Sequence, residues 1–164
     1  MLRQLLMTAA LIAAPAAAQD SHHAAQDAHA EGAADHHADP AAHREHHRQL
    51  LTSAAANPGR SEANVARDRY RHPVETLLFF DVEPHDTVVE IWPGGGWYTE
   101  ILAPYLKQGE GRLYAAAPDW GQGGITKLKE ANPALYGAIQ AADFPAFDTD
   151  TTRVPDGSAD VVLT

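Results

Sequence analysis

Three successive glycines follow an apolar run that carries a single charge. Glu90 is the charge within the run 87–91, and Gly94, Gly95 and Gly96 come shortly after it. The β-branched residues of the run predict a buried strand, and glycines allow positive φ angles and close approach of the backbone to a ligand. A helix that begins just after them would direct free N–H groups at that ligand. The segment therefore predicts a cradle for a small nucleotide-like molecule.

A second acidic residue stands where such a fold holds a ribose. Asp119 lies 23 residues after Gly96, at the tip of a strand expected over 112–117. In α/β nucleotide-binding folds, an acidic residue about 20 residues beyond the glycine loop accepts hydrogen bonds from ribose hydroxyls. A turn or N-cap residue before Gly121 is an equally good interpretation of Asp119.

Eight of the ten histidines lie within the first 47 residues, interspersed with acidic residues. They are His22, His23, His29, His36, His37, His43, His46 and His47. Imidazole and carboxylate groups together suit Zn²⁺, Cu²⁺ or Ni²⁺. If the segment is helical, His43 and His47 lie on one face at i, i+4 spacing. Because no spacing here defines a closed four-ligand site, the segment is expected to be either a labile metal-binding arm or a solvated spacer.

The chain divides into three segments of different composition. Residues 1–19 have a positive start at Arg3, an apolar run and small residues before Gln19, which predicts an export signal and a periplasmic or secreted protein. Residues 20–57 are rich in Ala, His, Asp and Glu, which predicts a disordered segment or a transient helix. Residues 58–164 are then expected to form one α/β domain of about 100 residues, enough for a single core.

Charge and composition exclude several classes of partner. The net charge of −10, from 22 acidic and 12 basic residues, argues against binding to nucleic acid or to an anionic membrane. The N-terminal apolar run is shorter than the ~20 residues that span a bilayer. The chain has no cysteine for a lipid anchor or a disulfide. The expected partner is a small molecule.

Helical and strand patterns alternate along the domain. Helices are expected over 61–71, with Ser61 as N-cap, from Pro73 onward, after the glycines and, weakly, over 121–130. Strands are expected near 87–91, 112–117, 138–144 and 159–164. This alternation predicts a Rossmann-like fold, with an open, mostly parallel sheet and flanking helices.

Three segments together resemble a known family. They are RDRYRHP at 67–73, VEIWPGGGWYTE at 89–100 and PDGSADVVLT at 155–164. The chain resembles the class I S-adenosylmethionine-dependent methyltransferases, and more narrowly a group of exported, predicted methyltransferases of bacteria. The middle segment is the most specific, since the general methyltransferase loop places an acidic residue ahead of alternating glycines. Pro93 stands where that loop usually has a glycine.

The resemblance implies a cofactor and a role for each acidic residue. The glycines at 94–96 would approach the methionine part of S-adenosylmethionine, and Glu90 would help to hold its ammonium group. Asp119 would take the ribose hydroxyls, and Asp143 would contact the adenine amino group unless it is an exposed loop carboxylate. The reaction would be in-line transfer of a methyl group from a sulfonium to an acceptor that the sequence does not identify. His72, Asp68 and Tyr98 are the candidates for an optional general base.

The family's usual strand order implies a four-stranded sheet in the order 3-2-1-4. Its apolar fourth strand would then be an open edge, which invites self-association. The domain is accordingly expected to be a fragment, incomplete at its C-terminus and catalytically poor.

Two other functions remain open at this point. A dinucleotide dehydrogenase is less favoured, because Thr99 stands where close helix packing requires Gly or Ala. An exported, non-enzymatic metal-binding protein would use the histidine-rich arm instead. Deletion of residues 20–57 is expected to spare cofactor binding in a methyltransferase-like protein and to abolish the main activity of a metal-binding one.

Overall fold

Helices and strands alternate along residues 39–146 and 152–164, which the computed structural model describes. The helices are α1 (Pro40–Ala55), α2 (Glu62–Val65), α3 (Asp68–Arg71), α4 (Pro73–Phe79), α5 (Thr99–Lys107), η1 (Asp119–Gly121), α6 (Gly123–Ala131) and α7 (Pro133–Tyr136). The strands are β1 (Thr87–Ile91), β2 (Arg112–Ala116), β3 (Gln140–Ala142) and β4 (Val161–Leu163). The expected export signal and five of the candidate metal ligands lie outside the described residues: His22, His23, His29, His36 and His37.

The four strands of the described residues form one open parallel sheet in the order β3-β2-β1-β4. The predicted α/β class, with a parallel sheet, flanking helices and this strand order, is confirmed. At one edge lies β4, where Val162 keeps 54% of its surface exposed. Self-association through that edge stays a prediction. No helix in the described part of the chain has the length and apolar character needed to cross a membrane.

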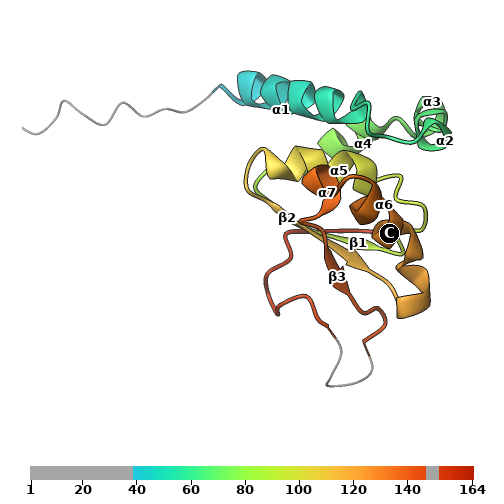
Figure 1. Cartoon of the computed structure of the whole chain (residues 1–164). Coiled ribbons are helices and arrows are strands. Elements are labelled where there is room, and N and C mark those ends of the chain that lie inside the picture. Colours follow the sequence, from blue (N-terminus) through green and yellow to red (C-terminus); the bar gives the residue numbers. More distant parts are fainter. Residues whose placement is uncertain (1–38, 147–151) are drawn as a thin grey trace, which may run out of the picture. The chain divides into compact units, whose positions relative to one another are not determined.

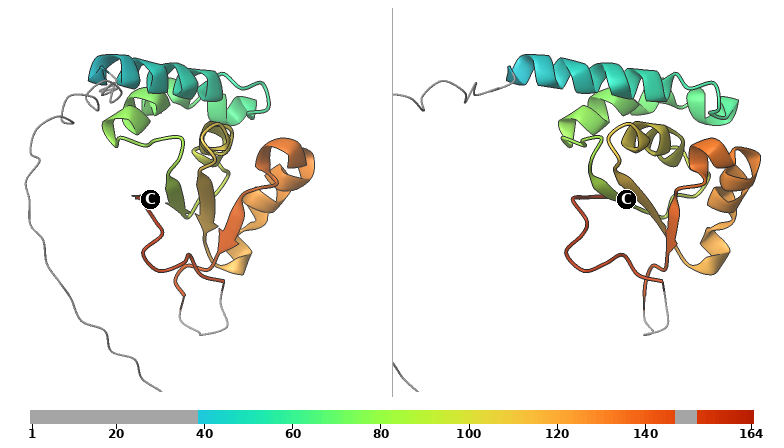
Figure 2. Two further views of the ribbon diagram at one scale, coloured as in Figure 1. Left: turned by 90° about the vertical axis from the view of Figure 1, so that its left-hand side faces the viewer. Right: turned by 60° about the vertical axis from the view of Figure 1, so that its left-hand side comes forward.

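The two faces of the sheet carry apolar clusters of different size. Successive side chains of a strand point to opposite faces, and Val88 and Leu113 accordingly join the large core beneath the helices. Val89 and Tyr114 belong to a smaller cluster on the other face, against which Val154 packs. Figures 1 and 2 show α1 outermost, with α4 and α5 between it and the sheet. The large core thus lies on the helical side.

Helix α1 corrects, for residues 40–55, the expectation of a disordered segment or a transient helix, and with it the expectation that the folded domain begins at 58. It is a regular helix of 16 residues, capped by the Asp39 carboxylate, which accepts a hydrogen bond from Ala41 N at 3.0 Å. His47, Leu51 and Ala54 form a buried stripe at helical spacing, on the side of α4 and α5. The stripe contains one large aliphatic side chain, Leu51, so the average composition of residues 20–57 did not indicate a buried helix. Deletion of residues 20–57 would therefore remove part of the core.

This packing predicts the effect of a single truncation in α1. Leu51 is fully buried, so Leu51→Ala is expected to lower the free energy of unfolding by about 2–3 kcal/mol through the lost contacts and the cavity left behind. Gln49→Ala, on the exposed side of α1, should change it by less than about 0.5 kcal/mol. Urea unfolding followed by circular dichroism measures both. Equal stabilities of the two variants would mean that α1 does not pack on the core.

The single helix expected over 61–71 is two short helices, α2 and α3. Ser61 caps α2 as predicted, because its side chain accepts from Asn64 N. The Asn64 carbonyl then accepts from Arg67 N at 3.0 Å and from the indole N–H of Trp97 at 3.1 Å. The bond from Arg67 N joins residues three apart, so the i to i+4 pattern of the α-helix is interrupted there. The break thus lies where Asn64 contacts the loop that follows β1.

Candidate functional site

A cleft of about 230 Å³ opens at the carboxyl ends of β1 and β4. Open α/β sheets bind ligands outside the carboxyl ends of their strands, where the strand order reverses. In this sheet the reversal lies between β1 and β4, since β2 and β3 continue on the other side of β1. The residues that line the cleft include Arg67, Arg71, Glu90, Gly94, Gly95 and Tyr98.

The glycine loop is a tight turn in which the three glycines have two kinds of function. Gly96 N–H donates to Pro93 O at 2.8 Å, and Gly94 and Gly96 have φ angles of 55° and 78°. A Cβ at position 96 would lie 2.6 Å from Leu128 Cδ1, so the Leu128 side chain of α6 would have to shift, and the positive φ itself disfavours any other residue there. No atom lies within 4 Å of the place where a Cβ of Gly95 would be. Gly94 and Gly96 thus shape the loop, and Gly95 leaves room for a ligand.

Side chains from the segment before β1 hold this loop in place. Asn64 Nδ2 donates to Gly95 O at 3.2 Å, and Trp97 Nε1 donates to Asp68 Oδ1 at 2.9 Å. Asp68 is in turn paired with both terminal nitrogens of Arg60, at 2.6 and 2.9 Å. Asp68 therefore has a positioning role, although the sequence made it a candidate base. Nothing in the sequence singled out Arg60 or Asn64.

Glu90 lies at the cleft as a buried carboxyl group, with 5% of its surface exposed. Its Oε2 accepts a hydrogen bond from the Thr99 hydroxyl at 2.5 Å. Burial raises the pKa of Glu90 to about 7, and the Thr99 hydrogen bond opposes part of that rise. Among the described residues, no Lys, Arg or His forms an ion pair with it. Such a group fits the cationic end of a ligand.

Two arginines line the same cleft as this carboxyl group. Arg67 and Arg71 border it, and the Arg71 guanidinium lies 4.5 Å from the centroid of the Trp97 ring, where a cation–π contact orients it. Tyr98 is half-buried at the cleft, and burial, more than any nearby charge, raises the pKa of its hydroxyl, so that it is a hydrogen-bond donor at neutral pH. A carboxyl group and guanidinium groups in one cleft match the two charges of an α-amino acid.

The other residues singled out from the sequence lie apart from the lining of the cleft. Asp119 is exposed at the start of η1, after β2. The Asp143 carboxylate, just after β3, accepts a hydrogen bond from Thr152 N at 2.8 Å. His72 is exposed between α3 and α4, with a left-handed φ of 44°. The structure thus brings the glycine loop and Glu90 together, and places these three side chains elsewhere.

Comparison with known proteins identifies no relative of this chain. The chain matches no protein-family model, no curated protein and no solved structure. Its function is therefore inferred from the buried carboxyl group, the arginines and the open glycine that meet at the cleft.

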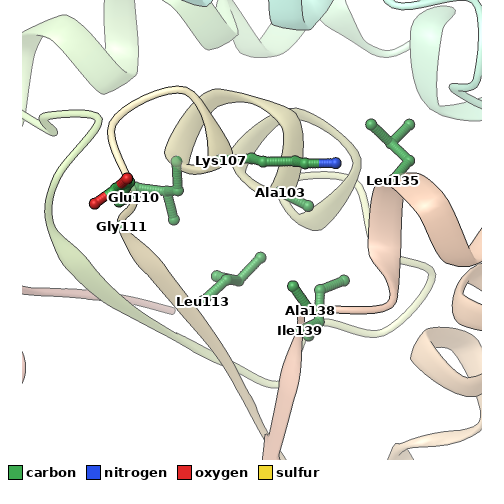
Figure 3. A pocket seen from close by; sticks show the side chains of 9 residues that line it. Ala103, Lys107, Glu110, Gly111, Leu113, Leu135, Ala138 and Ile139 are labelled. Carbon is green, nitrogen blue, oxygen red and sulfur yellow. The ribbon is translucent and has the colours of Figure 1, made fainter.

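A second hollow, of about 140 Å³, lies between α5, β2 and α7 (Figure 3). Leu113, Ala138 and Ile139 form an aliphatic wall, and Lys107 extends along α5 opposite them (Figure 3). The Lys107 ammonium already donates to Ala134 O at 3.0 Å. Ligand sites combine an apolar lining with a few convergent polar groups, so this hollow is better explained as loose packing.

Three of the candidate metal-binding histidines fall within the described residues, all on α1. The ring centroids of His43 and His47 are 4.1 Å apart, as expected for i, i+4 spacing on one helical face. Burial lowers the pKa of His47, despite the opposing effect of the Glu83 carboxylate. His46 is exposed, and its ring centroid lies 6.1 Å from that of His47.

Proposed function

We propose that the cleft between β1 and β4 binds S-adenosylmethionine and that the protein is methyltransferase-like, with an acceptor still to be identified. The observation that carries the proposal is a buried carboxyl group, without an ion-pair partner among the described residues, in the same cleft as two arginines at the point where the strand order reverses. The resemblance of the sequence around Glu90 to the methyltransferase loop supports the same ligand.

In this proposal the charges of the cleft hold the amino acid end of the cofactor. Glu90 accepts hydrogen bonds from its ammonium group, and Arg67 and Arg71 bind its carboxylate. The backbone at Gly95 approaches the ligand because no side chain occupies that space. The cofactor supplies a methyl group activated on its sulfonium, and the protein contributes by positioning it for in-line attack.

Titration calorimetry with S-adenosylmethionine, in the presence of a chelator, tests the proposal on the full chain. Gly95→Val is expected to weaken binding by more than about 10-fold, which is about 1.4 kcal/mol, because its side chain projects into the cleft. Gly123→Val is the matched control, since a Cβ at Gly123 also meets no atom within 4 Å but lies at the start of α6.

Both variants should unfold close to the wild-type temperature, because a Cβ at either position meets no atom within 4 Å. The proposal fails if the wild-type protein does not bind the cofactor, or if Gly95→Val binds it as well as Gly123→Val does.

A further inference from the structure

Two histidines of α1 meet a glutamate from the segment that joins α4 to β1. His43 Nε2 and His47 Nδ1 lie 4.0 and 3.9 Å from Glu83 Oε1. One ligand atom from each of the three side chains lies within 4.8 Å of the other two. They border a cavity of about 390 Å³, separate from the cleft at the glycine loop.

We propose that His43, His47 and Glu83 form a binding site for a divalent transition cation, with Zn²⁺ as the reference ion. Imidazole nitrogens and a carboxylate oxygen bind Zn²⁺ at about 2.0–2.2 Å, which places tetrahedral ligand atoms about 3.4 Å apart. To reach this spacing, each imidazole nitrogen needs to approach Glu83 Oε1 by about 0.5 Å, and the two imidazole nitrogens need to approach each other by at most about 1.4 Å. His43 is half-exposed and free to make that adjustment.

The backbone that carries Glu83 is fixed in position by its surroundings. The Glu83 backbone N–H donates to Asp86 Oδ2 at 2.8 Å, and the preceding carbonyl, of Val82, accepts from the Tyr105 hydroxyl at 2.8 Å. His85 Nδ1 lies 3.4 Å from Glu83 Oε2, the oxygen that does not face the α1 histidines. Of these partners, His85 contacts the carboxylate itself, and an outer partner of this kind orients a ligating carboxylate and tunes its affinity. The site is thus largely organised in the fold.

Charge and ligand number define the kind of site. Asp81 and Arg44 also border the cavity, so a negative and a positive side chain offset each other beside the ligands. Three protein ligands leave a fourth tetrahedral position for water or an exchangeable ligand. Nitrogen-rich ligation favours Zn²⁺, Cu²⁺ or Ni²⁺ over Mg²⁺ and Ca²⁺, which prefer oxygen ligands. A bound ion would link α1 to the segment before β1.

The test is a Zn²⁺ titration by calorimetry on the full chain. The five histidines that precede α1 are replaced by glutamine in every sample, so that their imidazoles do not contribute: His22, His23, His29, His36 and His37. One equivalent of Zn²⁺ is expected to bind. His43→Ala and Glu83→Gln should each weaken binding by more than about 10-fold, the effect of altering even an outer partner at metal sites. His46→Ala is the matched control on α1 and should leave the affinity unchanged.

Thermal unfolding gives an independent readout of the same site. Zn²⁺ should raise the unfolding temperature of the parent and of His46→Ala, because a ligand that binds the folded state stabilises it. At the same Zn²⁺ concentration the shift should be smaller for Glu83→Gln, because weaker binding stabilises the folded state less, and Mg²⁺ should have no effect on any sample. The proposal is wrong if one-equivalent binding is absent, if it survives both His43→Ala and Glu83→Gln, or if His46→Ala weakens it equally.

Discussion

Replacing Arg60 by methionine is expected to destabilise the protein by about 3–5 kcal/mol, the usual effect of removing one partner from a buried ion pair. The Arg60 side chain is fully buried, and it pairs with Asp68 at 2.6 Å and approaches Glu100 through Nε at 3.8 Å. The Glu100 side chain is itself only 1% exposed. Methionine fills similar space but leaves both carboxylates without their cation.

Urea unfolding of matched variants measures this effect. Arg69→Met removes an exposed arginine that stacks on Tyr70, and should change the free energy of unfolding by less than about 0.5 kcal/mol. Adding Glu100→Gln to Arg60→Met should recover part of the loss, because the amide does not bury a charge. Arg60→Met and Arg69→Met with the same stability would contradict the buried network.

The same network connects stability to the cleft. Asp68 binds both Arg60 and the Trp97 indole, and Asn64 binds both Trp97 and the Gly95 carbonyl. Loss of Arg60 should therefore loosen the glycine loop, although Arg60 does not line the cleft. Arg60 is thus a positioning residue for the proposed cofactor site.

The strand, glycine loop and helix around Glu90 could be predicted because each depends on local sequence. The β-branched run 87–91 forms β1, and two of the three glycines beyond it, Gly94 and Gly96, take the left-handed φ angles that other residues avoid. The strand order followed from the resemblance and is the order observed. Such elements can be predicted without knowledge of the tertiary contacts.

Features that depend on distant contacts could not be predicted in this way. Helix α1 is stable because Leu51 and Ala54 pack on other helices, which its polar composition does not reveal. His43 and His47 were expected to share a helical face, but Glu83 lies 36 residues beyond His47 and joins them only in the folded chain. The spacing of neighbouring residues in the sequence does not indicate which distant residues will join them in a site.

The buried carboxyl group of Glu90 should make the stability of the protein depend on pH. Its pKa is about 7 in the folded protein against an ordinary value of 4.5, so the folded state binds a proton more tightly than the unfolded state does. The contribution of this proton to the free energy of unfolding is fully present below pH 4.5 and is lost as the pH rises through 7. The difference between the two pKa values corresponds to about 3 kcal/mol of stability.

Glu90→Gln is therefore expected to match the wild type near pH 4.5 and to be about 3 kcal/mol more stable at pH 8. The glutamine oxygen can still accept the Thr99 hydroxyl, so the variant keeps that hydrogen bond and loses only the ionisable group. Urea unfolding measures the stability of both proteins across this pH range. The titration of every other residue contributes equally to both, so it cancels when the two free energies of unfolding are subtracted. A difference independent of pH would show that Glu90 titrates normally in the folded protein.

The same substitution should have the opposite effect on ligand binding. An ammonium group beside Glu90 would favour the ionised carboxylate, so binding of S-adenosylmethionine should release a proton near pH 6 and strengthen as the pH rises toward 8. Glu90→Gln should bind more weakly and without this pH dependence. If the variant is more stable at pH 8 but binds the cofactor less well, the carboxylate lowers the stability of the protein and contributes to ligand binding. A variant that gains stability and keeps full affinity would place the ammonium elsewhere.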